Sequence, residues 1–297
     1  FAAAKNNDLK TIKSLVEEND VPLESTDKDH QTVAIIAAKN GHLDIVKYAA
    51  DKKSSKIDHR DRWGNTVLHA PDQQNAMDIV NYLEGKFKTG TIEWKRSDFE
   101  SMAIHAAARF GHWKTLNYFL DQLNSNADAI DEETGDPSTF TAVKNRHEDV
   151  FKYLVEKKNA NLTAVNDNGD NILYVAVEQD DLPTMKYVLE ERKAPIDINW
   201  QNTFGNTLIH RAAIQSRLEI LKYLVEEKHA NVNVLGYENR TALSLASTRN
   251  NYDFCEYLIE HGADPLLKDQ FGYYPAQRAF DKQLDAYLRN ITAIRNI

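Results

Sequence analysis

The sequence predicts an all-α fold, a solenoid of helix-turn-helix units joined by short β-turn or hairpin loops. The first observation is a period near 34 residues, and such a period indicates a repeat architecture. Residues two positions after each turn glycine, or its equivalent, mark it: Thr32, Thr66, Met102, Pro137, Asn171, Thr207, Thr241 and Tyr274, at steps of 34, 36, 35, 34, 36, 34 and 33.

The second observation is the composition of the two helices expected in each repeat. The first helix is rich in alanine, as in Ala106–Ala108, because neighbouring helices crowd it. The second carries a spaced apolar stripe, such as Val150, Tyr153 and Leu154. One helix pair cannot bury its apolar face alone, so the pairs are expected to stack and share a continuous core.

Several stretches together resemble the ankyrin repeat. Residues 205–213 read GNTLIHRAA, residues 37–46 read AAKNGHLDIV, and residues 261–265 read HGADP. The resemblance covers essentially residues 1–297. It implies a single ankyrin-repeat domain of about nine repeats, the first truncated: approximately 1–25, 26–60, 61–96, 97–131, 132–165, 166–201, 202–235, 236–268 and 269–297.

Composition excludes several classes of function. The formal net charge is −9 and the pI is near 5.6, which disfavours nucleic-acid binding. Cys255 is the only cysteine, so neither an intrachain disulfide nor a cysteine-based zinc site is expected. No apolar run is long enough for membrane insertion. These features favour a cytoplasmic location, or the host cytoplasm if the protein is a secreted effector.

The sequence carries no phosphate-binding loop or hydrolase motif, so we expect no enzyme activity, no cofactor and no metal. Thr66 with His69, and Thr207 with His210, could be read as catalytic pairs. A threonine that caps a helix, with a histidine bonded locally, is the better interpretation, and the resemblance also implies a structural pair. Cys255 lies between apolar residues of a second helix and is expected in the core.

Residues 61–145 fit the repeat least well. Pro71 stands about one turn into the expected first helix, which therefore starts late or breaks. The following connection, 85–100, is long and lacks the usual turn. Two interpretations stay open: drift in a tolerant repeat, or a bend or specialised contact region.

The resemblance implies that partners bind on the turn tips and on the concave face of the first helices. The slot before the turn glycine carries Asp29, Trp63, Phe99, Thr134, Asn168, Phe204, Glu238 and Phe271, with Tyr237 beside Glu238. Exposed aromatic and arginine residues supply much of the energy at interfaces. The alternative is that each ring packs on the neighbouring turn.

Basic residues gather around the irregular region: Arg60, Arg62, Lys95, Arg96 and Arg109, interleaved with Trp63, Trp94, Phe99 and Phe110. This patch is predicted to bind an acidic or aromatic-containing peptide or protein surface. The full set of predicted partner-binding residues is Arg62, Trp63, Phe99, Arg109, Phe110, Phe204, Ile214, Tyr237 and Phe271.

Two classes of function follow. The first is a non-catalytic scaffold or adaptor that binds a protein or peptide. The second is the targeting or substrate-selecting array of a larger enzyme, channel, toxin or secreted bacterial effector. The second is favoured by a start inside a repeat and by an apolar stripe at the end (Leu284, Tyr287, Leu288, Ile291 and Ile294) that no further repeat covers. A monomer is expected.

Overall fold

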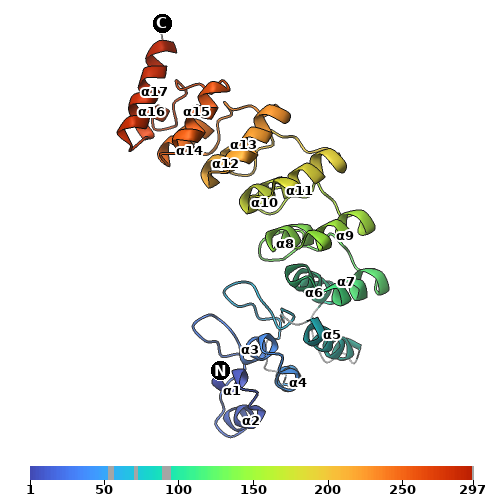
Figure 1. Ribbon diagram of the computed structural model, residues 1–297. Helices are drawn as coiled ribbons and strands as arrows, with labels where there is room; N and C mark the ends of the chain where they lie inside the picture. The colour runs from blue at the N-terminus through green and yellow to red at the C-terminus, as the bar shows by residue number, and fades with distance from the viewer. Residues whose placement is uncertain (53–56, 70–72, 89–94, 296–297) are drawn as a thin grey trace. The chain divides into compact units, whose positions relative to one another are not determined.

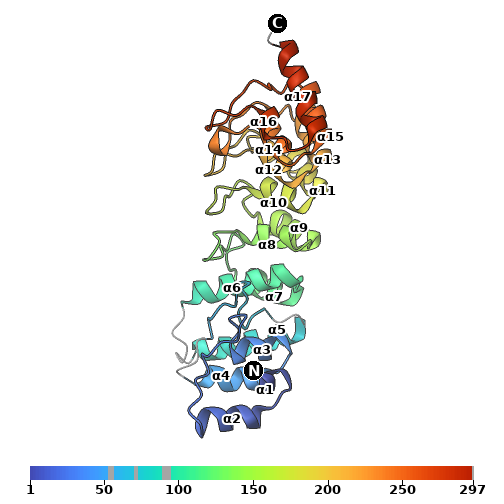
Figure 2. The ribbon, with the colours of Figure 1, turned by 90° about the vertical axis from the view of Figure 1, so that its left-hand side faces the viewer.

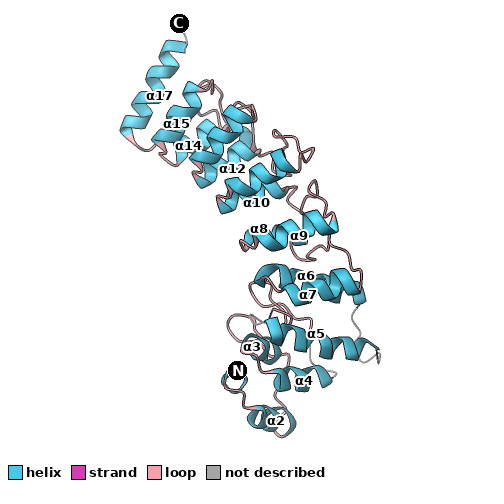
Figure 3. Cartoon of the chain, turned by 45° about the vertical axis from the view of Figure 1, so that its right-hand side comes forward, coloured by secondary structure: helices cyan, strands magenta, loops and turns pink. Residues whose placement is uncertain are grey.

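The computed structural model describes residues 1–52, 57–69, 73–88 and 95–295. In this part of the chain the ordered elements are helices, and the predicted all-α repeat fold is confirmed (Figure 3). Extended pairing is limited there to isolated bridges, Ile130 with Pro137 and Val165 with Asn171. The chain divides into two compact units, Phe1–Asn161 and Leu162–Ile297, each described by itself below.

The first compact unit, Phe1–Asn161, is built from stacked helix pairs (Figures 1 and 2). Its elements are α1 (Ala2–Lys5), α2 (Leu9–Glu17), α3 (Val33–Lys39), α4 (Leu43–Asp51), α5 (Gln73–Lys88), α6 (Arg96–Phe110), α7 (Trp113–Asn117), the π-helical turn η1 (Tyr118–Gln122), α8 (Ser138–Lys144) and α9 (Glu148–Lys158). Helix α1 packs on α3, α4 on α5, α5 on α7, and α6 on α8. Each pair therefore buries its apolar face against the next pair.

The second compact unit, Leu162–Ile297, repeats the same arrangement. Its elements are α10 (Ile172–Gln179), α11 (Leu182–Lys186), η2 (Tyr187–Glu191), α12 (Leu208–Gln215), α13 (Leu218–Lys222), η3 (Tyr223–Glu227), η4 (Tyr237–Asn239), α14 (Ala242–Thr248), α15 (Tyr252–Glu260), α16 (Pro275–Arg278) and α17 (Lys282–Arg295). The first helices form a row in which α10 packs on α12, α12 on α14, and α14 on α16.

Side-chain caps explain where the first helices begin. The Thr241 hydroxyl accepts a hydrogen bond from the Ser244 amide at 3.2 Å, and Asn171 caps α10 in the same way. At α12, the Thr207 amide donates to His210 Nδ1 at 3.1 Å, and His210 Nε2 lies 3.0 Å from the Arg240 carbonyl oxygen. Because Nδ1 accepts, Nε2 carries the proton and donates to the next repeat. The structural interpretation of this pair is confirmed.

Residues that open the second helices also bind the preceding repeat. His42 Nε2 lies 2.9 Å from the Lys5 carbonyl oxygen, and His147 Nε2 lies 2.9 Å from that of Arg109. In the second compact unit, Arg217 fills the same slot and donates to the Glu178 carbonyl at 3.2 Å. Each contact supplies a donor to a carbonyl near a helix end, where intrahelical partners run out.

A tyrosine–carboxylate contact links second helices of successive repeats. Tyr48 donates to Glu17 at 3.0 Å, and Lys52 donates to the same oxygen at 3.0 Å. The same three-residue arrangement, which we call the tyrosine ladder, recurs as Tyr82–Asp51–Lys86, Tyr153–Asp121–Lys158 and Tyr223–Glu190–Lys228, with His261 in place of lysine in Tyr257–Glu226–His261.

The third repeat departs from the pattern, as the sequence indicates. Val67 and Leu68 lie in a turn where the first helix is expected, and Pro71 lies outside the described residues. Helix α5 then runs unbroken through Asn75 and Ala76, at the positions where Gly41 and His42 separate the two helices of the preceding repeat. Among the described residues of this repeat, the single helix α5 therefore replaces the expected pair of helices.

The fourth repeat has a helix in place of its turn. The expected loop over 85–100 is wrong at both ends, because α5 continues to Lys88 and α6 already begins at Arg96. Asp98 lies in the first turn of α6, where the helix dipole favours an acid, and Arg96 pairs with Glu100 at 2.7 Å. A turn tip is therefore missing between residues 61–65 and 131–136.

Phe99 is the clearest correction. The sequence places it at an exposed turn tip, but it is 0% exposed and lies on α6. Its ring packs edge to face on Phe119, with centroids 5.7 Å apart. Because the turn is replaced by helix, this side chain faces the core and is not available to a partner.

The last helix also differs from expectation. Leu284 and Leu288 of the α17 stripe are buried, and Tyr287 packs against Tyr252 with ring centroids 5.2 Å apart. Only the end of the stripe is open, where Ile294 is 60% exposed. The stripe is thus largely covered by the compact unit's own helices α15 and α16, and the expectation of an uncovered face is wrong for most of it.

Candidate functional site

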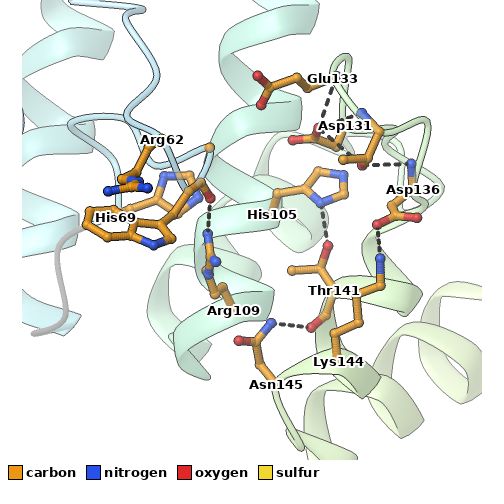
Figure 4. Close-up of a pocket in the computed structure, with 13 residues that line it drawn as sticks. Arg62, His69, His105, Arg109, Asp131, Glu133, Asp136, Thr141, Lys144 and Asn145 are labelled. Atoms are coloured by element: carbon orange, nitrogen blue, oxygen red, sulfur yellow. Dashed lines mark hydrogen bonds and ion pairs between the residues drawn. The ribbon is translucent and has the colours of Figure 1, made fainter. Parts of the chain in front are cut away.

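The missing turn leaves a pocket in the first compact unit. It has a volume of about 410 Å³ and opens between residues 61–65 and 131–136 (Figure 4). Its lining comes from both turns and from α6 and α8: Arg62, Trp63, Gly64, His69, His105, Arg109, Asp131, Glu133, Thr134, Asp136, Thr141, Lys144 and Asn145. The irregular region of the sequence therefore forms a specific cavity.

Asp61 fixes the turn that bears Trp63. Its Oδ1 accepts hydrogen bonds from the amides of Trp63 and Asn65 at 2.9 and 2.8 Å, and Lys39 Nζ lies 2.6 Å from Oδ2. Burial raises the pKa of Asp61, but the hydrogen bonds from Lys39 and Asn65 outweigh that effect and hold the pKa at about 2. The carboxylate is therefore charged at neutral pH and fully occupied by the scaffold.

The opposite wall is acidic, but two of its acids are paired. Asp131 accepts from Arg60 Nη1 at 3.0 Å and from the Glu133 amide at 3.0 Å. Asp136 forms an ion pair with Lys144. Glu133 lies exposed at the rim, and its carboxylate reaches the turn at Gly64, where a Cβ would lie 3.3 Å from Oε2. Gly64 has φ +75°, a conformation that favours glycine.

Two buried histidines line the interior. His105 bonds the Thr141 hydroxyl at 2.8 Å and the Ala129 carbonyl at 3.0 Å. His69 Nδ1 accepts from the Thr66 amide at 3.0 Å. Burial lowers both pKa values, that of His69 to about 3, with Arg109 and Arg60 adding to the shift. Both rings are therefore neutral at pH 7, and both form hydrogen bonds within the scaffold.

Arg109 and Trp63 face each other on the other side of the pocket. Arg109 Nη1 donates to Asn65 Oδ1 at 2.7 Å and to the Trp63 carbonyl at 3.3 Å. The indole of Trp63 is 51% exposed, with Lys39 Nζ 5.1 Å and the Arg62 guanidinium 5.5 Å from its centre. Cations at these distances are attracted electrostatically to the face of an aromatic ring.

The structure gathers part of the predicted basic–aromatic patch. Arg62, Trp63 and Arg109 line the pocket, and half-buried Phe110 follows Arg109 and stacks on His112 with centroids 5.6 Å apart. Lys95 and Arg96 are not among the lining residues. Trp94 lies outside the described residues.

The predicted residues of the second compact unit lie on its turn tips and first helix. Phe204, Tyr237 and Phe271 are 52%, 56% and 56% exposed. Phe204 and Tyr237 meet edge to face with centroids 6.5 Å apart, so the alternative of ring packing between neighbouring turns holds in part for them. Ile214 is half-buried on α12.

Sequence reasoning missed several members of these surfaces. Tyr273 is exposed, and the Arg278 guanidinium lies 4.6 Å from its ring centre. The acidic wall at Asp131 and Asp136, with Lys144, is a further feature that the sequence analysis did not predict. No period-based argument could find it, because it depends on a helix replacing the turn at residues 96–100.

Three further features of the described parts of the chain bear on its chemistry and location. Cys255 is fully buried, and burial raises the pKa of its thiol to about 11, which confirms the core interpretation. Among the residues that the structure describes, no group of three or more histidine, cysteine or acidic side chains is placed to hold a metal ion. Within the same residues, no helix is both long and apolar enough to span a membrane.

The comparison with known families agrees with this architecture. A family model described as ankyrin repeats (3 copies) matches residues 1–98, 104–197 and 173–269. The chain therefore belongs to the ankyrin-repeat family. Ankyrin repeats are generally protein–protein interaction modules and are typically non-catalytic. A search of curated proteins found no match.

Proposed function

We propose that this chain is a non-catalytic scaffold or adaptor that binds a protein or peptide through its turn tips and the adjoining face of its first helices. The observation that carries the proposal is the half-exposed aromatic residue at turn tips in each compact unit: Trp63 in the first, and Phe204, Tyr237 and Phe271 in the second. Large aromatic rings beside open surface are the usual anchors of protein interfaces.

The hydrogen bonds within the scaffold support the same proposed function. The buried polar groups near the turns, including Asp61, Thr207 and His210, are engaged by hydrogen bonds within the scaffold. The side chains left open at the tips include four aromatic rings and the guanidinium of Arg62. Binding by presented surface residues on a fixed scaffold is how solenoid repeats work in general. The fully buried thiol of Cys255 fits a reducing compartment, so we propose the cytoplasm as the location.

The test uses peptides selected from a random displayed library against the whole chain. A tip variant carries Trp63→Ser, Phe204→Ser, Tyr237→Ser and Phe271→Ser. Its matched control, Leu15→Ser with Phe280→Ser and Ile294→Ser, also removes exposed apolar groups, but away from the tips. We expect the tip variant to bind the selected peptides at least about tenfold more weakly, because anchor residues commonly contribute over 1 kcal/mol each.

Biolayer interferometry measures the affinities, circular dichroism checks folding, and light scattering tests the expected monomer. The control should keep affinity within about twofold, because that change lies within the roughly 0.5 kcal/mol scatter of neutral surface substitutions. Equal losses in the two variants, or no loss in either, would contradict binding through the turn tips.

A further inference from the structure

We propose that the pocket between residues 61–65 and 131–136 receives one acidic side chain, an aspartate or glutamate of a protein partner, with Arg109 as its anchor. This inference rests on the proposed function and deepens it. It names the charge of the group that enters the pocket, the residue that binds it, and the groups that select against other anions.

Arg109 stands apart from the cations around it. Each of its neighbours has a carboxylate partner: Lys39 with Asp61, Arg60 with Asp131, Arg62 with Asp29, and Lys144 with Asp136. Arg109 pairs with no carboxylate among the residues that the structure describes, although it is half-buried and lines the cavity. A carboxylate is the partner that would form the strongest hydrogen bonds with a guanidinium in this setting.

The scaffold holds this guanidinium in place without using all its donors. Nη1 donates to Asn65 Oδ1 at 2.7 Å and to the Trp63 carbonyl at 3.3 Å. Nε and Nη2 donate to no group in the described part of the chain. A guanidinium has five N–H donors in a fixed fork, so the remaining ones can bind both oxygens of a carboxylate. Preorganisation of this kind lowers the entropic cost of binding.

Arg109 and Arg60 contribute positive potential at His69, inside the pocket. Both interior histidines are neutral at pH 7, and the pKa of His69 is lowered mainly by burial and then by Arg109 and Arg60. The half-exposed Trp63 indole forms an apolar lip next to the guanidinium. A carboxylate carried by a peptide could therefore reach Arg109 while its neighbouring residue packs on the indole.

The opposite wall limits the charge that the pocket accepts. Asp131, Glu133 and Asp136 line it, and Glu133 forms no ion pair with another described residue. A single negative charge held by Arg109 is tolerated, whereas a phosphate dianion would meet like charge from this wall. Repulsive elements of this kind set specificity as effectively as attractive ones. The cavity of about 410 Å³ also fits a side chain better than a duplex or a folded domain.

The experiment selects peptides from a random displayed library with the wild-type chain and with Arg109→Glu. Wild type should enrich Asp or Glu at one position, and Arg109→Glu should enrich Lys or Arg there. For one selected acidic peptide, Arg109→Gln should weaken binding at least about tenfold, the effect of losing one charge-assisted bidentate contact. Changing the acidic residue of the peptide, Glu→Gln or Asp→Asn, should weaken binding by the same factor. Combining this change with Arg109→Gln should weaken binding little further.

Lys114→Gln is the matched control for Arg109→Gln, because it makes the same charge change on an exposed residue of α7 outside the pocket lining. It should leave the affinity within about twofold, as surface changes usually do. If Arg109→Gln fails to fold by circular dichroism, the peptide substitution and Arg109→Lys still test the contact. Additive losses, or no acidic enrichment, would overturn the inference.

Two further outcomes separate this inference from the proposed function. Selected peptides that lose affinity in the tip variant but not in Arg109→Gln would leave the scaffold function standing and reject the acidic pocket. Failure to select any peptide, or peptides indifferent to both variants, would reject both. Inorganic phosphate is the competing probe: if it displaces the acidic peptide more effectively than acetate at equal ionic strength, the pocket prefers a dianion and the inference is wrong.

Discussion

At the scale of single residues, the histidines of the turn–helix junctions perform structural work that depends on their being neutral. His210 is almost fully buried, accepts a hydrogen bond at Nδ1 and donates from Nε2. Burial lowers its pKa to about 4, against an ordinary value of 6.5. Protonation would place a charge in a buried site and would remove the acceptor that the Thr207 amide uses.

We therefore predict that His210 makes the fold sensitive to acid. Because its folded pKa lies below its unfolded pKa, the stability it contributes is present above pH 6.5 and is lost as the pH falls toward 4. The largest possible loss in the free energy of unfolding is on the order of 3 kcal/mol, because each unit of difference between the folded and unfolded pKa is worth about 1.4 kcal/mol. His210→Gln should be less stable at pH 7 but should lose less stability between pH 6.5 and 4.

Urea unfolding at a series of pH values measures how the stability of wild type and of His210→Gln changes between pH 6.5 and 4. The carboxylates of the chain titrate in both proteins, so comparing the two slopes removes most of their effect. Parallel loss of stability in wild type and His210→Gln over this range would mean that His210 is not the group responsible.

At the scale of elements, the tyrosine ladder ties the second helices of neighbouring repeats together outside the apolar core. In the second compact unit, Tyr223 donates to Glu190 at 2.9 Å and Lys228 donates to the same oxygen at 2.9 Å. Burial and the neighbouring Glu190 raise the pKa of the Tyr223 hydroxyl, so it remains a donor at neutral pH. The contact combines a charge-assisted hydrogen bond with an exposed ion pair.

We predict that Tyr223→Phe lowers the unfolding temperature by a few degrees, because a buried tyrosine loses its hydroxyl donor to a carboxylate while the ring stays packed. Tyr237→Phe is the matched control, since that side chain lies exposed on a turn tip. It should leave the temperature unchanged. High salt should weaken the Lys228 contribution more than that of the tyrosine, since exposed ion pairs are screened. Differential scanning calorimetry distinguishes the two variants, and equal midpoints would contradict a stabilising role for the ladder.

The elements also show how far the sequence could predict this molecule. Repeats with a turn glycine and a capping threonine or asparagine, such as those beginning α10 and α12, could be predicted because local chemistry sets their boundaries. The fourth repeat could not. Residues 96–100 lack a turn glycine and carry an i,i+4 ion pair that stabilises a helix. They therefore form a helix where the repeat period predicts a turn, and the side chain of Phe99 faces the core.

The candidate site follows from the same cause. From the sequence, Trp63 could be predicted to be an exposed aromatic residue and Arg109 a basic residue near it. The pocket between them could not be predicted, because it exists only where a turn is absent. The wall at Asp131 and Asp136 contributes to it through side chains that lie about 70 residues from Trp63 in the sequence and two turns apart in the repeat order.

At the scale of the whole molecule, each compact unit is a row of repeats in which contacts run between neighbours. In the second compact unit, α12 packs on α10 and on α14, while α14 separates it from α16. Leu208 of α12 is completely buried. Stability in such an array is close to a sum of repeat and interface contributions, so the effect of local damage should decrease with distance along the row.

We predict that Leu208→Ala, which should cost about 2–5 kcal/mol as a large-to-small core change, accelerates amide hydrogen exchange most in α12, next in α10 and α14, and least in α16. Gln215→Ala is the matched control on an exposed position of the same helix and should leave the pattern unchanged. Exchange followed by mass spectrometry resolves these helices as separate peptides. An equal acceleration from α10 to α16 would show that the second compact unit opens as one cooperative block, and the nearest-neighbour description would then be wrong for it.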